Sequence, residues 1–190
     1  MNNIYLVGFM GTGKTSVGEG LAKKMKRRFI DLDDLIELKE RRRICDIFAQ
    51  EGEPYFRRSE HEALKEVARE KDFIVACGGG IVVNRDNIKI MKETGRIICL
   101  RASLPVILKR IRGASHRPLL NVKDQQEQIK CLLKMRAPFY ASADRSIDTS
   151  RLSIDEVISR VSRLTGEKKN KPGRGNRKPA PKRKAKVKKI

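Results

Sequence analysis

Short apolar runs alternate with longer segments of helical periodicity through the first 165 residues of the chain. Runs of strand length lie at residues 4–7, 29–30, 73–76, 97–100 and 146–148. The segments between them place apolar residues three or four positions apart, at about residues 17–25, 35–40, 44–48, 56–69, 86–93, 105–111, 124–140 and 154–164. Strands that alternate with helices favour right-handed crossovers. The pattern therefore predicts a three-layer α/β/α fold with a five-stranded parallel sheet.

Glycines and capping residues set the limits of several predicted helices. Gly52 is expected to break the segment around it, and Gly95 to end the helix before the fourth strand. Ser103 is expected to cap the helix that has Pro105 in its first turn, and residues 153–156 form a Ser-x-x-Glu capping box. The final helix carries an apolar face that we expect to be buried, namely Ile154, Val157, Ile158, Val161 and Leu164.

The first strand runs into a glycine-rich loop, GFMGTGKT at residues 8–15, and then into the first helix. Its glycines allow tight turns and point successive backbone N–H groups toward an anion at the positive end of the helix dipole. Lys14 is expected to reach the β- and γ-phosphates, and the Thr15 hydroxyl to bind a Mg²⁺ ion that bridges them. This P-loop predicts a P-loop NTPase-type fold that binds a nucleoside triphosphate through Gly11, Thr12, Gly13, Lys14, Thr15 and Ser16.

Two carboxylates follow the second strand, at the edge of the sheet where open α/β folds bind ligands. One of Asp31 and Asp33 is expected to support the Mg²⁺ shell, directly or through water, and the other to accept a hydrogen bond from a substrate hydroxyl. The alternative is that Asp33 or Asp34 caps the next helix.

Two further patches have chemistry suited to a second, anionic substrate. Arg57 and Arg58 stand near the start of a helix, where an arginine fork can bind a carboxylate bidentately or, alternatively, form a solvated charged surface. Residues 78–80 are three consecutive glycines after the third strand, and they offer backbone N–H groups that a ligand can approach closely.

Residues 112–124 have neither strand nor helix periodicity and connect two predicted helices. A polar loop in this position is a candidate for a mobile lid. His116 lies inside it and adjoins Arg117, so the two could titrate together, whereas we expect both His61 and His116 to be solvated.

The charge of the chain is uneven. Residues 167–190 contain twelve Lys and Arg against one acid, so they carry +11 of the net charge of +21. With almost no apolar residue, this segment is predicted to be a disordered basic tail that follows a single domain at residues 1–166. Such a tail could bind a polyanion or nucleic acid without sequence preference, although it has no aromatic residues for base stacking.

The four cysteines, Cys45, Cys77, Cys99 and Cys131, are too far apart for a C-x-x-C motif and are expected to be buried, reduced thiols. The chain shows no signal-peptide pattern and no apolar run of membrane-spanning length. We therefore expect a cytoplasmic protein without membrane contact.

Taken in order, six patches resemble the shikimate kinase family. They are GFMGTGKT, FIDLDDLIE, FRRSE, the three glycines at 78–80, Arg117-Pro118-Leu119-Leu120 and Arg136-Ala137-Pro138-x-Tyr140. The resemblance spans about residues 3–164. It implies a nucleoside-monophosphate-kinase-like fold, with an acceptor-binding region at about residues 31–61 and a lid at about 112–124. It also implies transfer of the ATP γ-phosphoryl group, with Mg²⁺, to the 3-hydroxyl of shikimate, by a protein expected to be a monomer.

By this resemblance, each role falls on a residue of this chain. Asp33 holds the shikimate hydroxyls, Arg57 and Arg136 bind its carboxylate, and Gly79 with Gly80 contributes backbone contacts. Asp31 lies beside Mg²⁺, Glu60 orients Arg57, and Arg110 lies beside the adenine. The catalytic set implied is Lys14, Asp33 and Arg117, with Arg117 swinging over the transferred group. The departures from the family pattern are Cys77, where a small or apolar residue is common, and the basic tail.

Other kinases remain alternatives, because a P-loop leaves the acceptor open. A small P-loop kinase for gluconate or for a nucleoside monophosphate has the same phosphate site. The latter class usually has a lid richer in arginine and a base-binding pocket, and the sequence shows no sign of such a pocket. Whether Asp33 takes the hydroxyl proton also stays open, since a carboxylate near Mg²⁺ is a poor base.

Overall fold

A computed structural model describes residues 2–111 and 125–166 of the chain. The centre of the molecule is a sheet of five parallel strands in the order β2-β3-β1-β4-β5. The strands are β1 (Asn3–Val7), β2 (Arg28–Asp31), β3 (Phe73–Ala76), β4 (Gly95–Arg101) and β5 (Arg145–Asp148). The prediction of an α/β fold with a five-stranded parallel sheet is confirmed.

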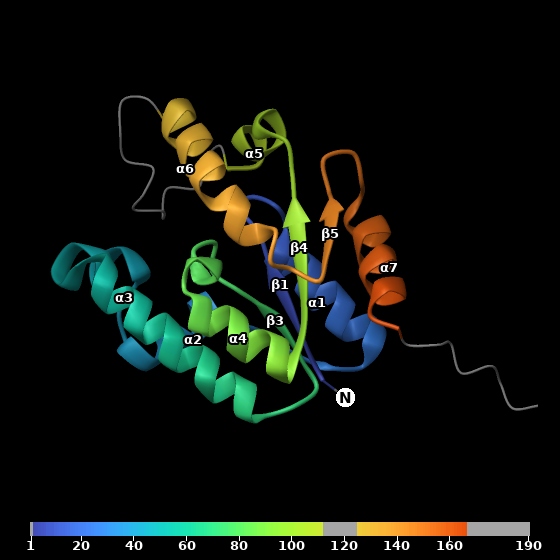
Figure 1. Ribbon diagram of the computed structural model, residues 1–190, viewed down its shortest axis with the longest axis horizontal. Helices are drawn as coiled ribbons and strands as arrows, with labels where there is room; N and C mark the ends of the chain where they lie inside the picture. Colours follow the sequence, from blue (N-terminus) through green and yellow to red (C-terminus); the bar gives the residue numbers. More distant parts are fainter. Residues whose placement is uncertain (1, 112–124, 167–190) are drawn as a thin grey trace, which may run out of the picture.

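Helices cover both faces of this sheet (Figure 1). The helical elements are α1 (Lys14–Met25), α2 (Leu32–Glu40), α3 (Ile44–Arg69), the 3₁₀ helix η1 (Ile81–Val83), α4 (Arg85–Thr94), α5 (Leu104–Ile111), α6 (Gln125–Tyr140) and α7 (Ile154–Leu164). Helices α1 and α7 pack together on one face, and α2, α3 and α4 lie on the other. Helices α5 and α6 stand beyond the carboxyl ends of the strands, where the site described below is found.

The sheet separates two hydrophobic cores, because successive side chains of a strand point to opposite faces. In β1, Ile4 and Leu6 join the core under α1 and α7, whereas Tyr5 and Val7 join the core under the other helices. All four side chains are buried, and each such burial contributes roughly 1.5–3 kcal/mol to folding. Strand β1 is thus packed on both faces of the sheet, and this fixes the start of the loop that follows it.

Most predicted helix limits agree with the structure. Gly52 has a non-helical conformation inside α3 (φ 79°, ψ 174°), and Gly95 is the C-cap of α4. Ser153 and Glu156 form the predicted capping box of α7. The prediction that Ile154 is buried is wrong, because this residue begins α7 beside the P-loop and is 52% exposed.

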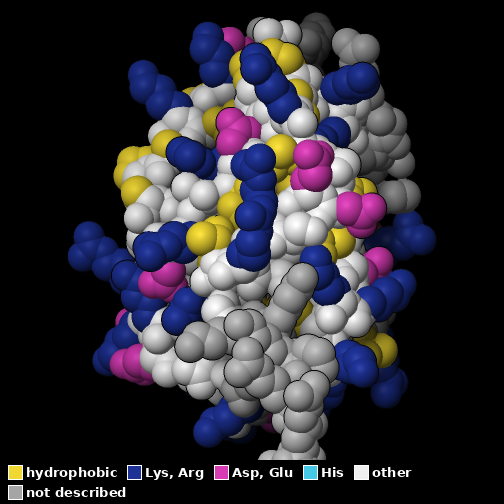
Figure 2. Space-filling view, turned by 90° about the vertical axis from the view of Figure 1, so that its right-hand side faces the viewer, with side chains coloured by type: hydrophobic (Ala, Val, Ile, Leu, Met, Phe, Trp, Pro, Cys, Tyr) yellow, Lys and Arg dark blue, Asp and Glu magenta, His cyan; other side chains and the backbone are white. Residues whose placement is uncertain are grey.

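Lys and Arg side chains are spread over the side of the molecule that carries α7, with fewer Asp and Glu among them (Figure 2). No helix within residues 2–111 and 125–166 combines the length and apolar character needed to cross a bilayer. The predicted lid at 112–124 and the predicted basic tail at 167–190 lie outside the described residues.

Candidate active site

The loop between β1 and α1 forms the predicted anion site. Gly11 and Gly13 have left-handed backbone conformations (φ 75° and 94°), which favour glycine, and α1 begins directly after Gly13. The Lys14 ammonium group donates hydrogen bonds to the carbonyls of Gly8 (3.0 Å) and Phe9 (3.1 Å). The amino end of α1 and the Lys14 charge therefore face the same space, as phosphate binding requires.

A cavity of about 400 Å³ extends from this loop toward α7. Its lining changes along its length, from the P-loop residues 11–16 to the apolar Leu152, Ile154 and Val157. Arg110 also lines it, and its guanidinium is fixed by hydrogen bonds to the Thr149 hydroxyl (3.0 Å) and carbonyl (3.0 Å). A molecule with phosphates at one end and a flat apolar ring at the other fits this lining.

Asp31 links the P-loop to the start of α2. Its Oδ2 accepts a hydrogen bond from the Thr15 hydroxyl (2.8 Å), and its Oδ1 accepts one from the backbone N–H of Asp33 (3.0 Å). The alternative in which Asp33 or Asp34 caps α2 is wrong, because Asp31 is the N-cap. The side chain of Asp33 is therefore not needed for capping.

The three consecutive glycines, Gly78–Gly80, form a turn that we call the glycine turn. A Cβ atom built at Gly78 would lie 2.9 Å from Asp33 Oδ1. One at Gly79 would lie 3.6 Å from Arg136 Nη1, and one at Gly80 would lie 2.3 Å from Arg57 Nη2. The chain thus brings Asp33, Arg57 and Arg136, which we call the clamp residues, against one strip of bare backbone.

Arg57 is held in place by two acids of α3. Its Nη1 donates to Glu60 Oε2 (2.8 Å), while Nε and Nη2 donate to Glu53 Oε1 (3.1 and 2.9 Å). Glu60 thus contacts Arg57, the residue that it is predicted to orient. Glu53 was not predicted, and its only sequence signal is its position four residues before Arg57 on a helix.

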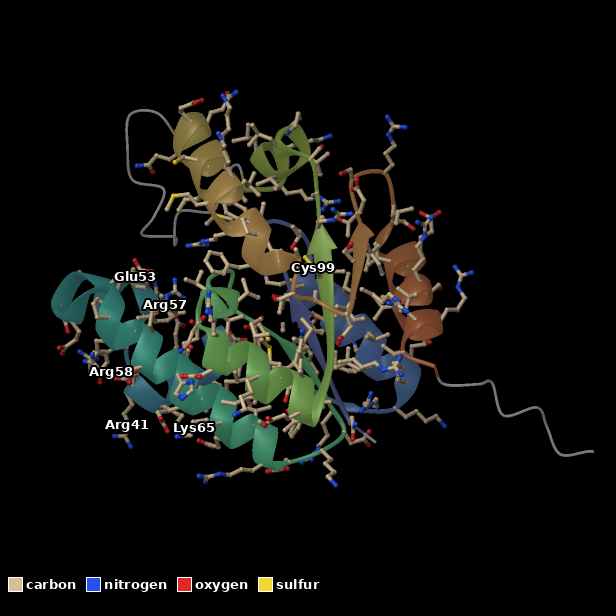
Figure 3. The ribbon with its side chains drawn as sticks, in the orientation of Figure 1. Arg41, Glu53, Arg57, Arg58, Lys65 and Cys99 are labelled. Carbon is tan, nitrogen blue, oxygen red and sulfur yellow. The ribbon has the colours of Figure 1, made fainter. Side chains whose placement is uncertain are left out.

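Arg57 and Arg58 differ in their surroundings (Figure 3). Arg58 is exposed, so the alternative of a solvated charge holds for it. Arg57 faces the glycine turn, and the side chain of its partner Glu60 is only 1% exposed. Burial raises the pKa of Glu60, and the nearby Arg57 charge opposes this shift.

Arg136 approaches the glycine turn from α6, whereas Arg57 approaches it from α3. Its guanidinium lies 5.8 Å from the centre of the Phe9 ring, and the residue is buried. Four residues later on the same helix, the Tyr140 hydroxyl donates to the carbonyl of Gly79 (2.6 Å). No role for Tyr140 was predicted, although its spacing from Arg136 places both residues on one helix face.

Two predictions about side chains outside the clamp need correction. His61 is not simply solvated, since its Nδ1 donates to Asn87 Oδ1 (2.6 Å), and the amide of the buried Asn87 donates to the carbonyl of Ile81 (3.1 Å). All four cysteines are free, but only Cys77 and Cys99 are buried. Burial raises the pKa of both thiols, that of Cys99 to about 11, so they stay protonated near neutral pH.

The predictions for Arg117 and His116 concern residues that lie outside the described part of the chain.

Comparison with known proteins identifies the family to which this site belongs. The sequence profile described as shikimate kinase matches residues 10–165. The chain belongs to the shikimate kinase family. The shikimate kinase of Thermodesulfovibrio yellowstonii is 45% identical over 161 residues, 85% of this chain and 93% of that protein. The shikimate kinase of Thermoanaerobacter pseudethanolicus is 47% identical over 161 residues, 85% of this chain and 94% of that protein.

A solved structure of the shikimate kinase family agrees with the fold. The shikimate kinase of Acinetobacter baumannii, solved in complex with shikimate, superposes with a TM-score of 0.83 at 36% identity. The match covers 86% of this chain and 92% of that one. The likeness to this shikimate kinase thus extends over most of both chains.

Proposed function

We propose that this chain transfers the γ-phosphoryl group of ATP to the 3-hydroxyl of shikimate, giving shikimate 3-phosphate and ADP for chorismate and aromatic amino acid synthesis. Membership of the shikimate kinase family supports the reaction class. The observation that carries the proposal is the meeting of a carboxylate and two guanidiniums, Asp33, Arg57 and Arg136, at the glycine turn beside the P-loop. A small hydroxylated carboxylic acid complements this set of charges.

The nucleotide is proposed to lie in the cavity at the P-loop. Its phosphates would rest on the backbone N–H groups of Gly11–Gly13, with Lys14 and Ser16 beside them, and its adenine beside Arg110. The Thr15 hydroxyl and the Asp31 carboxylate are hydrogen-bonded to each other. A Mg²⁺ ion held by these two oxygen-bearing groups would take its other ligands from the phosphates and from water, as is usual for this ion. Bound Mg²⁺ would neutralise phosphate charge during transfer.

The acceptor is proposed to lie on the glycine turn. Arg57 and Arg136 would bind its carboxylate from two sides, while Asp33 accepts hydrogen bonds from its hydroxyls and the N–H groups of Gly79 and Gly80 add backbone contacts. A loose phosphoryl transition state needs positioning and charge stabilisation more than covalent chemistry. Arg117, from the proposed lid, would supply further positive charge over the transferred group.

A coupled assay of ADP release tests the proposed acceptor. Shikimate, gluconate and AMP are offered separately with MgATP, and we expect turnover with shikimate and background rates with the other two. Phosphorylation of gluconate or AMP without that of shikimate would contradict the proposal. Detection of shikimate 3-phosphate by phosphorus NMR separates transfer from simple ATP hydrolysis.

Replacing Gly80 by alanine is expected to raise the KM for shikimate about tenfold. The backbone of Gly80 (φ −104°, ψ −5°) is open to alanine, but the new methyl group would displace the Arg57 guanidinium. That group ends a flexible side chain, but moving it weakens its ion pair with the buried Glu60, so stability should fall by about 1–3 kcal/mol. Steady-state kinetics with each substrate, beside a thermal melt, measure both effects.

Gly20→Ala is the matched control for this substitution. A Cβ at Gly20 would lie 2.3 Å from Ile158 Cδ1, so it crowds another flexible side chain, but between α1 and α7. We expect an unchanged KM for shikimate in the control. Equal KM values in the Gly80 variant and the wild type would show that Arg57 does not bind the acceptor.

We further propose that residues 1–166 form the kinase domain and that residues 167–190 are an accessory polyanion-binding segment. The proposal rests on the twelve Lys and Arg of that segment. Ending the chain after Gly166 is expected to leave kcat and KM within twofold of the full chain and to abolish its salt-dependent retention on heparin. A large loss of turnover, or unchanged retention, would contradict this division.

A further inference from the structure

One hydrogen bond joins the two walls of the proposed acceptor site. The Tyr140 hydroxyl, at the carboxyl end of α6, donates to the carbonyl of Gly79 at 2.6 Å, across 61 positions of sequence. Two other bonds to the glycine turn come from nearby in the chain. The N–H groups of Ile81 and Val83 donate to the carbonyls of Gly78 (3.3 Å) and Gly80 (3.0 Å). Tyr140 therefore ties the turn to a different element of the fold.

The same helix delivers a clamp residue to the same glycine. Arg136 lies one helical turn before Tyr140, and its Nη1 lies 3.6 Å from the position that a Cβ of Gly79 would take. The guanidinium and the phenol thus approach Gly79 together from α6. A shift of α6 relative to the turn would move the guanidinium away from the backbone N–H groups that face the acceptor.

The surroundings of Tyr140 suit a fixed donor. The residue is only 9% exposed, and its ring belongs to the core formed beneath α6. Burial raises the pKa of its hydroxyl, and the nearby Arg136 charge only partly opposes this effect. The group therefore stays protonated and keeps donating throughout the pH range of enzyme assays.

We propose that Tyr140 is a positioning residue for the acceptor, whose hydroxyl sets the distance between the Arg136 guanidinium and the glycine turn through its bond to Gly79. This inference rests on the proposed function, since it concerns the binding of shikimate. Tyr140 acts through Arg136 and the turn and does not itself touch the reacting atoms. Its loss should weaken acceptor binding and leave the nucleotide site as it is.

Tyr140→Phe tests this role because it removes only the hydroxyl and keeps the ring. We expect the KM for shikimate to rise about tenfold, with kcat within threefold and the KM for ATP within twofold of the wild type. The loss of one buried hydrogen bond should lower Tm by a few degrees, about 2–5 °C.

Tyr5→Phe is the matched control. Tyr5 is fully buried in β1, and its hydroxyl is hydrogen-bonded to Thr94 Oγ1 (2.8 Å) and Asn3 Nδ2 (3.2 Å), away from the glycine turn. We expect a similar fall in Tm with no change in the KM for shikimate. Parallel changes in Tm and in both KM values for the two variants would mean that Tyr140 only stabilises the fold.

A double-mutant cycle with Arg136→Lys tests the route of the effect. If the hydroxyl acts by placing the Arg136 guanidinium, Tyr140→Phe should raise the KM for shikimate less than about threefold when residue 136 is lysine. A second full tenfold rise would overturn the proposed link to Arg136.

The outcomes also separate this inference from the proposed function. A wild-type protein without turnover on shikimate overturns both. A wild-type protein that phosphorylates shikimate, together with a Tyr140→Phe variant whose KM for shikimate stays within twofold, overturns the role of Tyr140 alone.

Discussion

Replacing Lys14 by alanine is expected to lower kcat about 10²–10³-fold while the protein stays folded. The ammonium group faces the proposed phosphate site, where negative charge must be stabilised during transfer, and removal of one such donor typically costs 10²–10³-fold. Lys14 also bonds the carbonyls of Gly8 and Phe9, so its loss should loosen the loop as well. A single-turnover assay of shikimate 3-phosphate formation measures the effect directly.

Lys23→Ala is the control for this prediction. Lys23 lies on the same helix but is exposed, so its removal changes net charge equally without touching the P-loop. Its kcat should stay within twofold of the wild type. A Lys14→Ala variant that keeps more than a tenth of wild-type turnover would contradict the proposed phosphate site.

Replacing Arg136 by alanine is expected to raise the KM for shikimate about 10²-fold, with a smaller effect on the KM for ATP. A charge-assisted bond to a carboxylate is worth about 1.5–3 kcal/mol, and 1.4 kcal/mol corresponds to a tenfold change. Arg136 is buried, so the truncation should also lower Tm. Kinetics at saturating ATP, with thermal melts beside them, separate binding from stability.

Two variants control for the loss of charge and of packing. Arg136→Lys keeps the positive charge but cannot form the bidentate pair. We therefore expect a KM for shikimate that is intermediate between those of the wild type and the alanine variant. Lys134→Ala removes an exposed charge from the same helix and should leave the KM unchanged. An unchanged KM for shikimate in Arg136→Ala would refute the proposed carboxylate contact.

The parts of the fold that depend on local sequence were predictable. The β1 strand, the P-loop and the start of α1 follow from an apolar run, spaced glycines and a helical pattern within 25 residues. The capping box at Ser153 is equally local. Each of these features is decided by neighbours in the chain, which a sequence pattern records directly.

Features that depend on distant segments were harder to predict. The sequence distinguishes poorly between Arg57 and Arg58, because only the packing of α3 beside the glycine turn decides which one faces inward. Asp31 takes the capping position because the end of β2 aims its carboxylate at the backbone N–H of Asp33. The bond between His61 and Asn87 joins α3 to α4 and leaves no periodic trace in either segment.

The meeting of the clamp residues was hard to predict for the same reason. Asp33, Arg57 and Arg136 belong to three different helices, α2, α3 and α6, and meet only at the glycine turn that follows β3. The individual residue roles therefore came from the family resemblance. Packing adds what the resemblance did not include, namely the contacts of Glu53 with Arg57 and of Tyr140 with Gly79.

The most direct test of the proposed acceptor site is a crystal structure of the protein with shikimate, Mg²⁺ and a non-hydrolysable ATP analogue. We expect the shikimate carboxylate within about 3 Å of both the Arg57 and Arg136 guanidiniums. The ring hydroxyls should face Asp33, and the 3-hydroxyl should point to the terminal phosphate on the P-loop. Shikimate bound away from the glycine turn, or both guanidiniums turned from its carboxylate, would contradict the proposed acceptor site.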